Sequence, residues 1–118
     1  MIIRFIKPDP RGGSAKLTVH KTGKLGLSKG AMELLNTGRN RFVRFGFGEQ
    51  DELLMQMCET AMENSFPVGR AGEYDYISAR TMLDELGVDY TAKETVIYDI
   101  KKTPEDGIYR LHQRVIKK

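Results

Sequence analysis

Apolar and polar residues alternate along several short segments of this chain, and this alternation constrains the fold more than any other feature. Residues 16–20 and 25–28 both show it, and Gly23 lies in the turn between them. A period of two is the pattern of half-buried strands, and a glycine that can take a positive φ allows the two strands to pair as a hairpin. Further strand-like segments are predicted over residues 41–47, 53–57, 66–68, 74–77, 95–100 and 108–115.

Two helices are predicted, and both are only about two turns long. Ser28 is the expected N-cap of a helix over Lys29–Leu35, which Asn36 ends in a left-handed conformation. Ser78 is the expected N-cap of a helix over Ala79–Leu86, which Gly87 stops. Helices this short are stable only when they pack against the rest of the protein.

The order of predicted elements repeats along the chain. Residues 16–57 and residues 66–115 each read as strand, strand, short helix, strand, strand, the second copy being divergent. We therefore predict an α+β, β-rich fold in which two pseudo-repeated β-β-α-β-β units with two short helices form one domain over residues 1–118. Residues 8–15, rich in Pro and Gly, are expected to be a flexible loop, and Ile2–Ile6 could form an edge strand.

Composition excludes several classes of protein. No apolar run is long enough to span a bilayer, so no membrane association is expected. The single cysteine, Cys58, cannot form an internal disulfide, which favours the reducing cytoplasm. No zinc-ligand spacing, P-loop or nucleophile motif occurs, so we expect a non-enzymatic protein without cofactor, bound metal or evident small-molecule substrate.

Charge is distributed unevenly between the two parts of the chain. Residues 1–48 hold ten Lys and Arg against two Asp and Glu, whereas residues 49–118 hold nine against fourteen. A clustered positive field attracts phosphate. The predicted nucleic-acid-binding residues are Lys21, Lys24, Lys29, Arg39, Arg41 and Arg44.

One segment resembles a known family. Residues 23–36, GKLGLSKGAMELLN, resemble the swapped-hairpin segment of AbrB-like transition-state regulators and antitoxins. The likeness runs over residues 16–57, with Ser28 where the family usually has proline and Met32 where it has arginine. It implies a bacterial transcriptional regulator that binds DNA, in which the six cations would hold phosphates and two chains would form a homodimer.

The sequence leaves two alternatives open. Residues 24–28 followed by a short helix also resemble the strand-to-helix corner of Whirly-like single-stranded-DNA-binding proteins, whose ligand lies over a curved sheet on lysines and stacked aromatic rings. A third possibility is a protein-interaction or assembly module with a sticky apolar surface. The residues that would form such a surface are Met55, Met57, Met62, Tyr74, Tyr76 and Tyr98.

Overall fold

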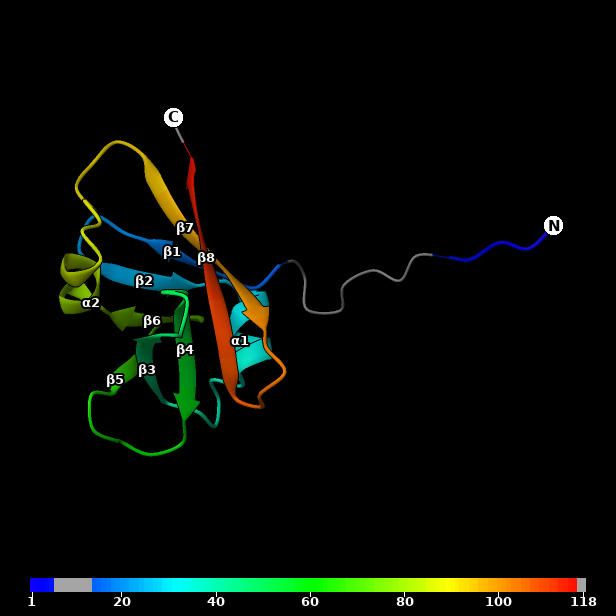
Figure 1. The fold of residues 1–118 in the computed structure, drawn as a ribbon, viewed down its shortest axis with the longest axis horizontal. Helices are drawn as coiled ribbons and strands as arrows, with labels where there is room; N and C mark the ends of the chain where they lie inside the picture. Colours follow the sequence, from blue (N-terminus) through cyan, green and yellow to red (C-terminus); the bar gives the residue numbers. More distant parts are fainter. Residues whose placement is uncertain (6–13, 117–118) are drawn as a thin grey trace.

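The strands close into one antiparallel barrel in the computed structural model, which describes residues 1–5 and 14–116 (Figure 1). Within those residues the elements are, in chain order, β1 (Lys16–Val19), β2 (Lys24–Leu27), α1 (Lys29–Leu35), β3 (Phe42–Phe47), β4 (Leu53–Cys58), β5 (Phe66–Ala71), β6 (Tyr74–Ser78), α2 (Arg80–Glu85), β7 (Thr95–Lys102) and β8 (Ile108–Ile116). Around the barrel the order is β1-β2-β6-β5-β3-β4-β8-β7, and β7 pairs back with β1. The loop predicted over residues 8–15 lies outside the described residues, apart from Ser14 and Ala15.

Local predictions around the first hairpin are confirmed. β1 and β2 pair antiparallel, and Gly23 in their turn has a φ of 83°. The Ser28 hydroxyl accepts a hydrogen bond from the backbone N–H of Ala31, as an N-cap does, and Asn36 ends α1 with a φ of 50°. Capping and turn chemistry depend on near neighbours in the sequence, which explains why the sequence alone predicts them.

The cap predicted for the second helix is wrong. The N-cap of α2 is Ala79, which offers no side-chain hydrogen bond, and the helix runs only from Arg80 to Glu85. Ser78 is instead the last residue of β6, where it lies opposite Lys24 of β2. Pairing with a neighbouring strand therefore holds Ser78 in the sheet and moves the start of the helix along the chain.

The predicted α+β fold of two β-β-α-β-β units is also wrong, because the protein is a mostly β closed barrel. Hairpins from the two proposed units alternate around it, because β1 pairs with β7, β2 with β6, β3 with β5 and β4 with β8. The helices have seven and six residues, lie on opposite sides of the barrel and form no layer of their own (Figure 1). Alternation along a strand indicates which face is buried but does not indicate which strand lies beside it.

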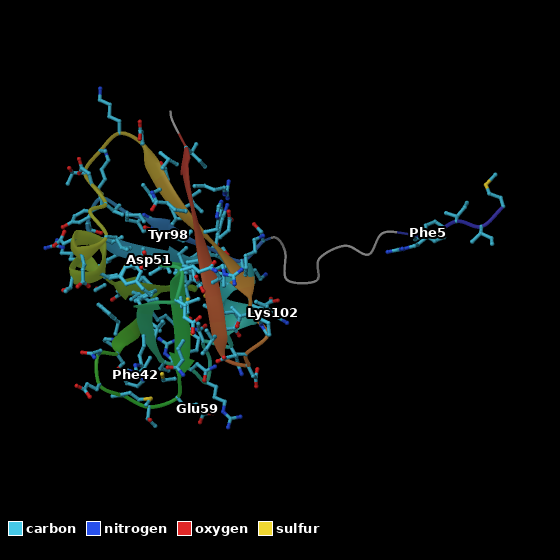
Figure 2. The ribbon with its side chains drawn as sticks, in the orientation of Figure 1. Phe5, Phe42, Asp51, Glu59, Tyr98 and Lys102 are labelled. Atoms are coloured by element: carbon cyan, nitrogen blue, oxygen red, sulfur yellow. The ribbon has the colours of Figure 1, made fainter. Side chains whose placement is uncertain are left out.

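Inward-facing residues of all eight strands fill the barrel. Leu17, Leu25, Met55 and Ile77 are fully buried, and α1 and α2 add further apolar side chains to the same core. Tyr98 also lies inside the barrel (Figure 2), where its hydroxyl donates to Gln113 at 3.2 Å. Burial raises the pKa of this phenol, which therefore stays neutral. The side chains that form the core therefore point inward from every strand, and the alternate residues point outward.

Ser28→Ala should destabilise the protein, whereas Ser78→Ala should not. The Ser28 hydroxyl accepts hydrogen bonds from Ala31 and Lys16 and donates one to Ser14, so its loss frees the start of α1 and the start of β1. We expect Ser28→Ala to lower the free energy of unfolding by about 1–2 kcal/mol in urea denaturation. Equal losses for the two variants would contradict this role of Ser28.

Candidate nucleic-acid interface

The six cations predicted to bind nucleic acid do not share one face of the barrel. Lys21 lies in the turn after β1, Lys24 begins β2 and Lys29 begins α1, all with exposed side chains. Arg44 lies on the outer face of β3, opposite Gln56. β6 and β5 stand between β2 and β3, and the β3–β5 ladder ends at Val43–Phe66, so no row of paired residues in the described part of the chain joins Arg44 to Lys24.

Two of the predicted arginines are held by acidic side chains. The Nε of Arg39 lies 2.7 Å from Oε1 of Glu59, and both side chains are exposed. Arg41 is half-buried: its guanidinium donates to the backbone carbonyls of Thr37 at 3.0 Å and Val68 at 2.8 Å. It also forms an ion pair with Asp75 at 3.2 Å, so its guanidinium N–H groups bind partners within the protein.

Asp75 is a carboxylate with no exposed surface on β6. Oδ1 is bound by Arg41 and by Arg70, whose Nε lies 3.1 Å away. Oδ2 is buried and has no hydrogen-bond partner among the described residues. Burial raises the pKa of Asp75, but its interactions with the side chains of Arg70, Thr37 and Arg41 outweigh burial, and the net pKa is lowered. Asp75 therefore stays ionised in the folded protein.

A different set of side chains does come together, on the outside of β8, β7, β1, β2 and β6. Cross-strand pairing places Arg114, Ile97, Thr18, Gly26, Tyr76 and Gly69 side by side in one continuous row from β8 to β5. Twelve outward-facing residues of these five strands form what we call the outer wall: Arg110, His112, Arg114, Ile97, Asp99, Lys101, Lys16, Thr18, Lys24, Gly26, Tyr74 and Tyr76.

The outer wall is mainly basic. Asp99 is its one acidic residue among those the structure describes, and both Nε and Nη2 of Arg114 donate to it. The hydrogen bond from Arg114 lowers the pKa of Asp99, so the pair is ionised. Lys101 and Arg110 lie directly opposite each other across β7 and β8, with both side chains exposed. Like charges opposite each other destabilise a sheet, and an anionic ligand would relieve that repulsion.

Tyrosines and small residues give the outer wall a flat aromatic part. The Tyr76 ring lies across Gly69, since a Cβ on that glycine would come within 2.6 Å of Cζ of the tyrosine. The Nζ of Lys24 lies over the same ring, 4.6 Å from its centroid. Tyr74, on the same strand, is 59% exposed. Exposed rings beside ammonium groups are the combination that binds the bases and phosphates of a single strand.

Sequence reasoning missed most of this surface. Of the six predicted cations only Lys24 belongs to the outer wall, which draws its other cations from β1, β7 and β8. The alternation of Arg110, His112 and Arg114 along the last strand was the available signal, because it marks one polar face. Their alignment with Lys16 and Lys24 depends on pairing between distant strands, which periodicity does not give.

No metal site is found among residues 1–5 and 14–116, where no three His, Cys, Asp or Glu side chains are arranged to hold an ion. Cys58 is a buried free thiol. Within the same described ranges, the helices are too short and too polar to cross a membrane.

Comparison of the chain with protein-family models, with curated proteins and with solved structures gives no match in any of the three. The function is therefore inferred from the geometry of the outer wall.

Asp75→Asn should destabilise the protein far more than Asp99→Asn. The first change leaves Arg41 and Arg70 without their counter-ion, and losing hydrogen bonds to a charged group of this kind costs about 2–3 kcal/mol. Asp99 pairs with an exposed arginine, and exposed pairs contribute little. Urea denaturation at neutral pH measures both losses.

The pH dependence supplies the control. Because the folded pKa of Asp75 is depressed, its contribution is present above the unfolded pKa of about 3.9 and is lost as pH falls through the folded value. The stability difference between the native protein and Asp75→Asn should therefore shrink as pH falls below about 4. A difference that stays constant with pH would contradict the conclusion that ionised Asp75 holds Arg41 and Arg70.

Proposed function

We propose that this protein is a non-enzymatic nucleic-acid-binding protein of the cytoplasm that holds single-stranded nucleic acid along its outer wall. The observation that carries the proposal is the outer wall, on which cations from four neighbouring strands and the rings of Tyr74 and Tyr76 share one surface. The AbrB-like and Whirly-like resemblances of the sequence both imply a nucleic-acid ligand. The Whirly-like resemblance implies a single strand lying over a curved sheet.

The cations of the outer wall are the first feature that suits a nucleic acid. Lys16, Lys24, Lys101 and Arg110 form no ion pair among the described residues, and they extend over four strands of the outer wall. A backbone of phosphates needs several cations on a rigid surface, and antiparallel strands fix these in place. The repulsion between Lys101 and Arg110 is a cost to the free protein that bound phosphate would remove.

The aromatic part of the outer wall favours single strands over duplexes. Bases that are unpaired can stack on Tyr74 and Tyr76, whereas bases in a duplex cannot. Reading a duplex through its major groove requires a protruding helix or ribbon with free arginine or amide donors. Here α1 and α2 bury part of their surface in the core, and Arg39 and Arg41 are bound to acids. The AbrB-like mode of duplex binding stays a prediction that the same experiment tests.

Lys101→Glu should weaken binding while leaving the fold intact or making it more stable. A carboxylate at this position would attract Arg110 on the neighbouring strand, so the melting temperature should be unchanged or raised. Affinity for a fluorescently labelled single-stranded oligonucleotide should fall roughly tenfold at low salt, measured by anisotropy. The affinity of the native protein should fall as the salt concentration rises. The logarithm of the association constant plotted against the logarithm of the salt concentration should have a slope of about −0.7 per phosphate contact for a single strand.

Arg39→Glu is the matched control, because it makes the same change of charge at an exposed position outside the outer wall. Its affinity should equal that of the native protein. Tyr76→Leu separates stacking from charge: it should weaken single-strand binding without changing the salt slope. Equal losses for Lys101→Glu and Arg39→Glu would overturn the proposal, and so would absence of binding at low salt. Tighter binding of duplex than of single strands would favour the AbrB-like mode instead.

A further inference from the structure

The segment Met1–Phe5 is apolar and makes no contact that buries it. Ile2 is fully exposed, Ile3 is 61% exposed and Phe5 is 84% exposed. Figure 2 shows Phe5 on a segment that stands well away from the barrel. These five residues belong to no strand in the structure, although Ile, Ile and Phe favour β conformation. Exposed apolar residues in such a row mark a binding segment more often than an ordinary surface.

An apolar groove of about 450 Å³ lies on the side of the barrel next to α2. Aromatic and aliphatic side chains from β3, β4, β5 and α2 line most of it, and Glu85 adds a negative charge. One lining residue, Phe47, is 57% exposed. The apolar residues of the lining are Phe45, Phe47, Leu53, Phe66, Met82 and Leu86.

The same groove contains an unpaired strand edge. The ladder between β3 and β5 ends at the pair Val43–Phe66. The carbonyl of Arg41 points toward β5, where the N–H of Val68 donates to it at 2.8 Å, so alternate residues of β3 point the same way. The backbone groups of Phe45 and Phe47 therefore face the groove, and no described residue on that side bonds to them.

We infer that Met1–Phe5 of a second copy of this chain docks in the groove as an added strand along the free edge of β3. An extended segment would pair with the backbone groups of Phe45 and Phe47. With alternating side chains, Ile3 and Phe5 enter the apolar lining, while Arg4 lies on the outer face near Gly46, where a side chain would meet no other atom.

The geometry favours docking of Met1–Phe5 in the groove of a second copy over docking in the groove of its own chain. Ser14, where the described barrel begins, accepts a hydrogen bond from Ser28 beside the first turn of α1, whereas the groove lies against α2 on the opposite side. Phe5 and Ser14 are nine residues apart in the sequence, so an extended chain separates them by at most roughly 32 Å. The two shorter dimensions of the molecule are each 37 Å. Reciprocal exchange between two chains gives a closed two-fold dimer, and the segment then does not have to reach across its own barrel.

Light scattering coupled to size exclusion tests this inference across a dilution series. The native chain, of 13.4 kDa, should elute as a dimer that dissociates on dilution. The double change Ile3→Asp with Phe5→Asp should give a folded monomer, since it alters only exposed side chains, and Phe47→Asp should do the same from the groove side. Ile116→Asp is the matched control, because Ile116 is an exposed apolar residue on β8, and it should remain dimeric.

Oxidative cross-linking distinguishes exchange between chains from docking within one chain. Chains carrying Cys58→Ala with Ile3→Cys are mixed with chains carrying Cys58→Ala with Phe47→Cys, so that only mixed pairs bring the two new thiols together. A disulfide-linked heterodimer is expected, and replacing Phe47→Cys with Ile116→Cys should abolish it. A native protein that is monomeric at every concentration, a dimer that survives Ile3→Asp with Phe5→Asp, or a mixture without heterodimer would each overturn the inference. The dimer does not depend on the proposed function, because Lys101→Glu should leave it unchanged.

Discussion

The barrel is closed through a seam between β3 and β5 that contains only two paired positions, Phe42–Pro67 and Val43–Phe66. Arg41 strengthens this seam from its end. Its carbonyl accepts from Val68, its guanidinium donates back to the carbonyl of Val68, and it forms an ion pair with the buried Asp75. A carboxylate without exposed surface is strongly destabilising unless it is paired, so Asp75 fixes Arg41 in place. The loop before β3, together with β5 and β6, is thereby held as one unit.

The surfaces on either side of the seam follow from this closure. Away from it, five neighbouring strands pair without interruption and place their outward residues in register, which gives a rigid basic wall with an aromatic part. Beyond the last pair of the seam, β5 diverges from β3 and leaves backbone groups and apolar side chains uncovered next to α2. One end of the same strand thus completes the barrel, and the other end offers an edge to a partner.

Local features were predictable from the sequence, whereas their assembly was not. Ser28 and Asn36 cap α1 through neighbours within a few residues, and alternation correctly marked the buried positions of β1 and β2. Arg41 has the appearance of a phosphate ligand in the sequence, because its partner Asp75 lies on a distant strand. Lys101 and Arg110 stand out only in the structure, where they face each other across β7 and β8. In each case the important contact joins residues on different strands, which local sequence patterns do not predict.

Amide hydrogen exchange, followed residue by residue by NMR, tests most directly whether Arg41 and Asp75 hold the barrel closed. In the native protein the Val68 amide, which donates to Arg41 across the seam, should exchange as slowly as the amides of the β7–β8 hairpin. When the Asp75 carboxylate is replaced by an amide, Val68 should exchange much faster while the hairpin amides stay protected relative to it. If Val68 keeps the same protection relative to the hairpin in both proteins, the seam does not depend on this ion pair and the account is contradicted.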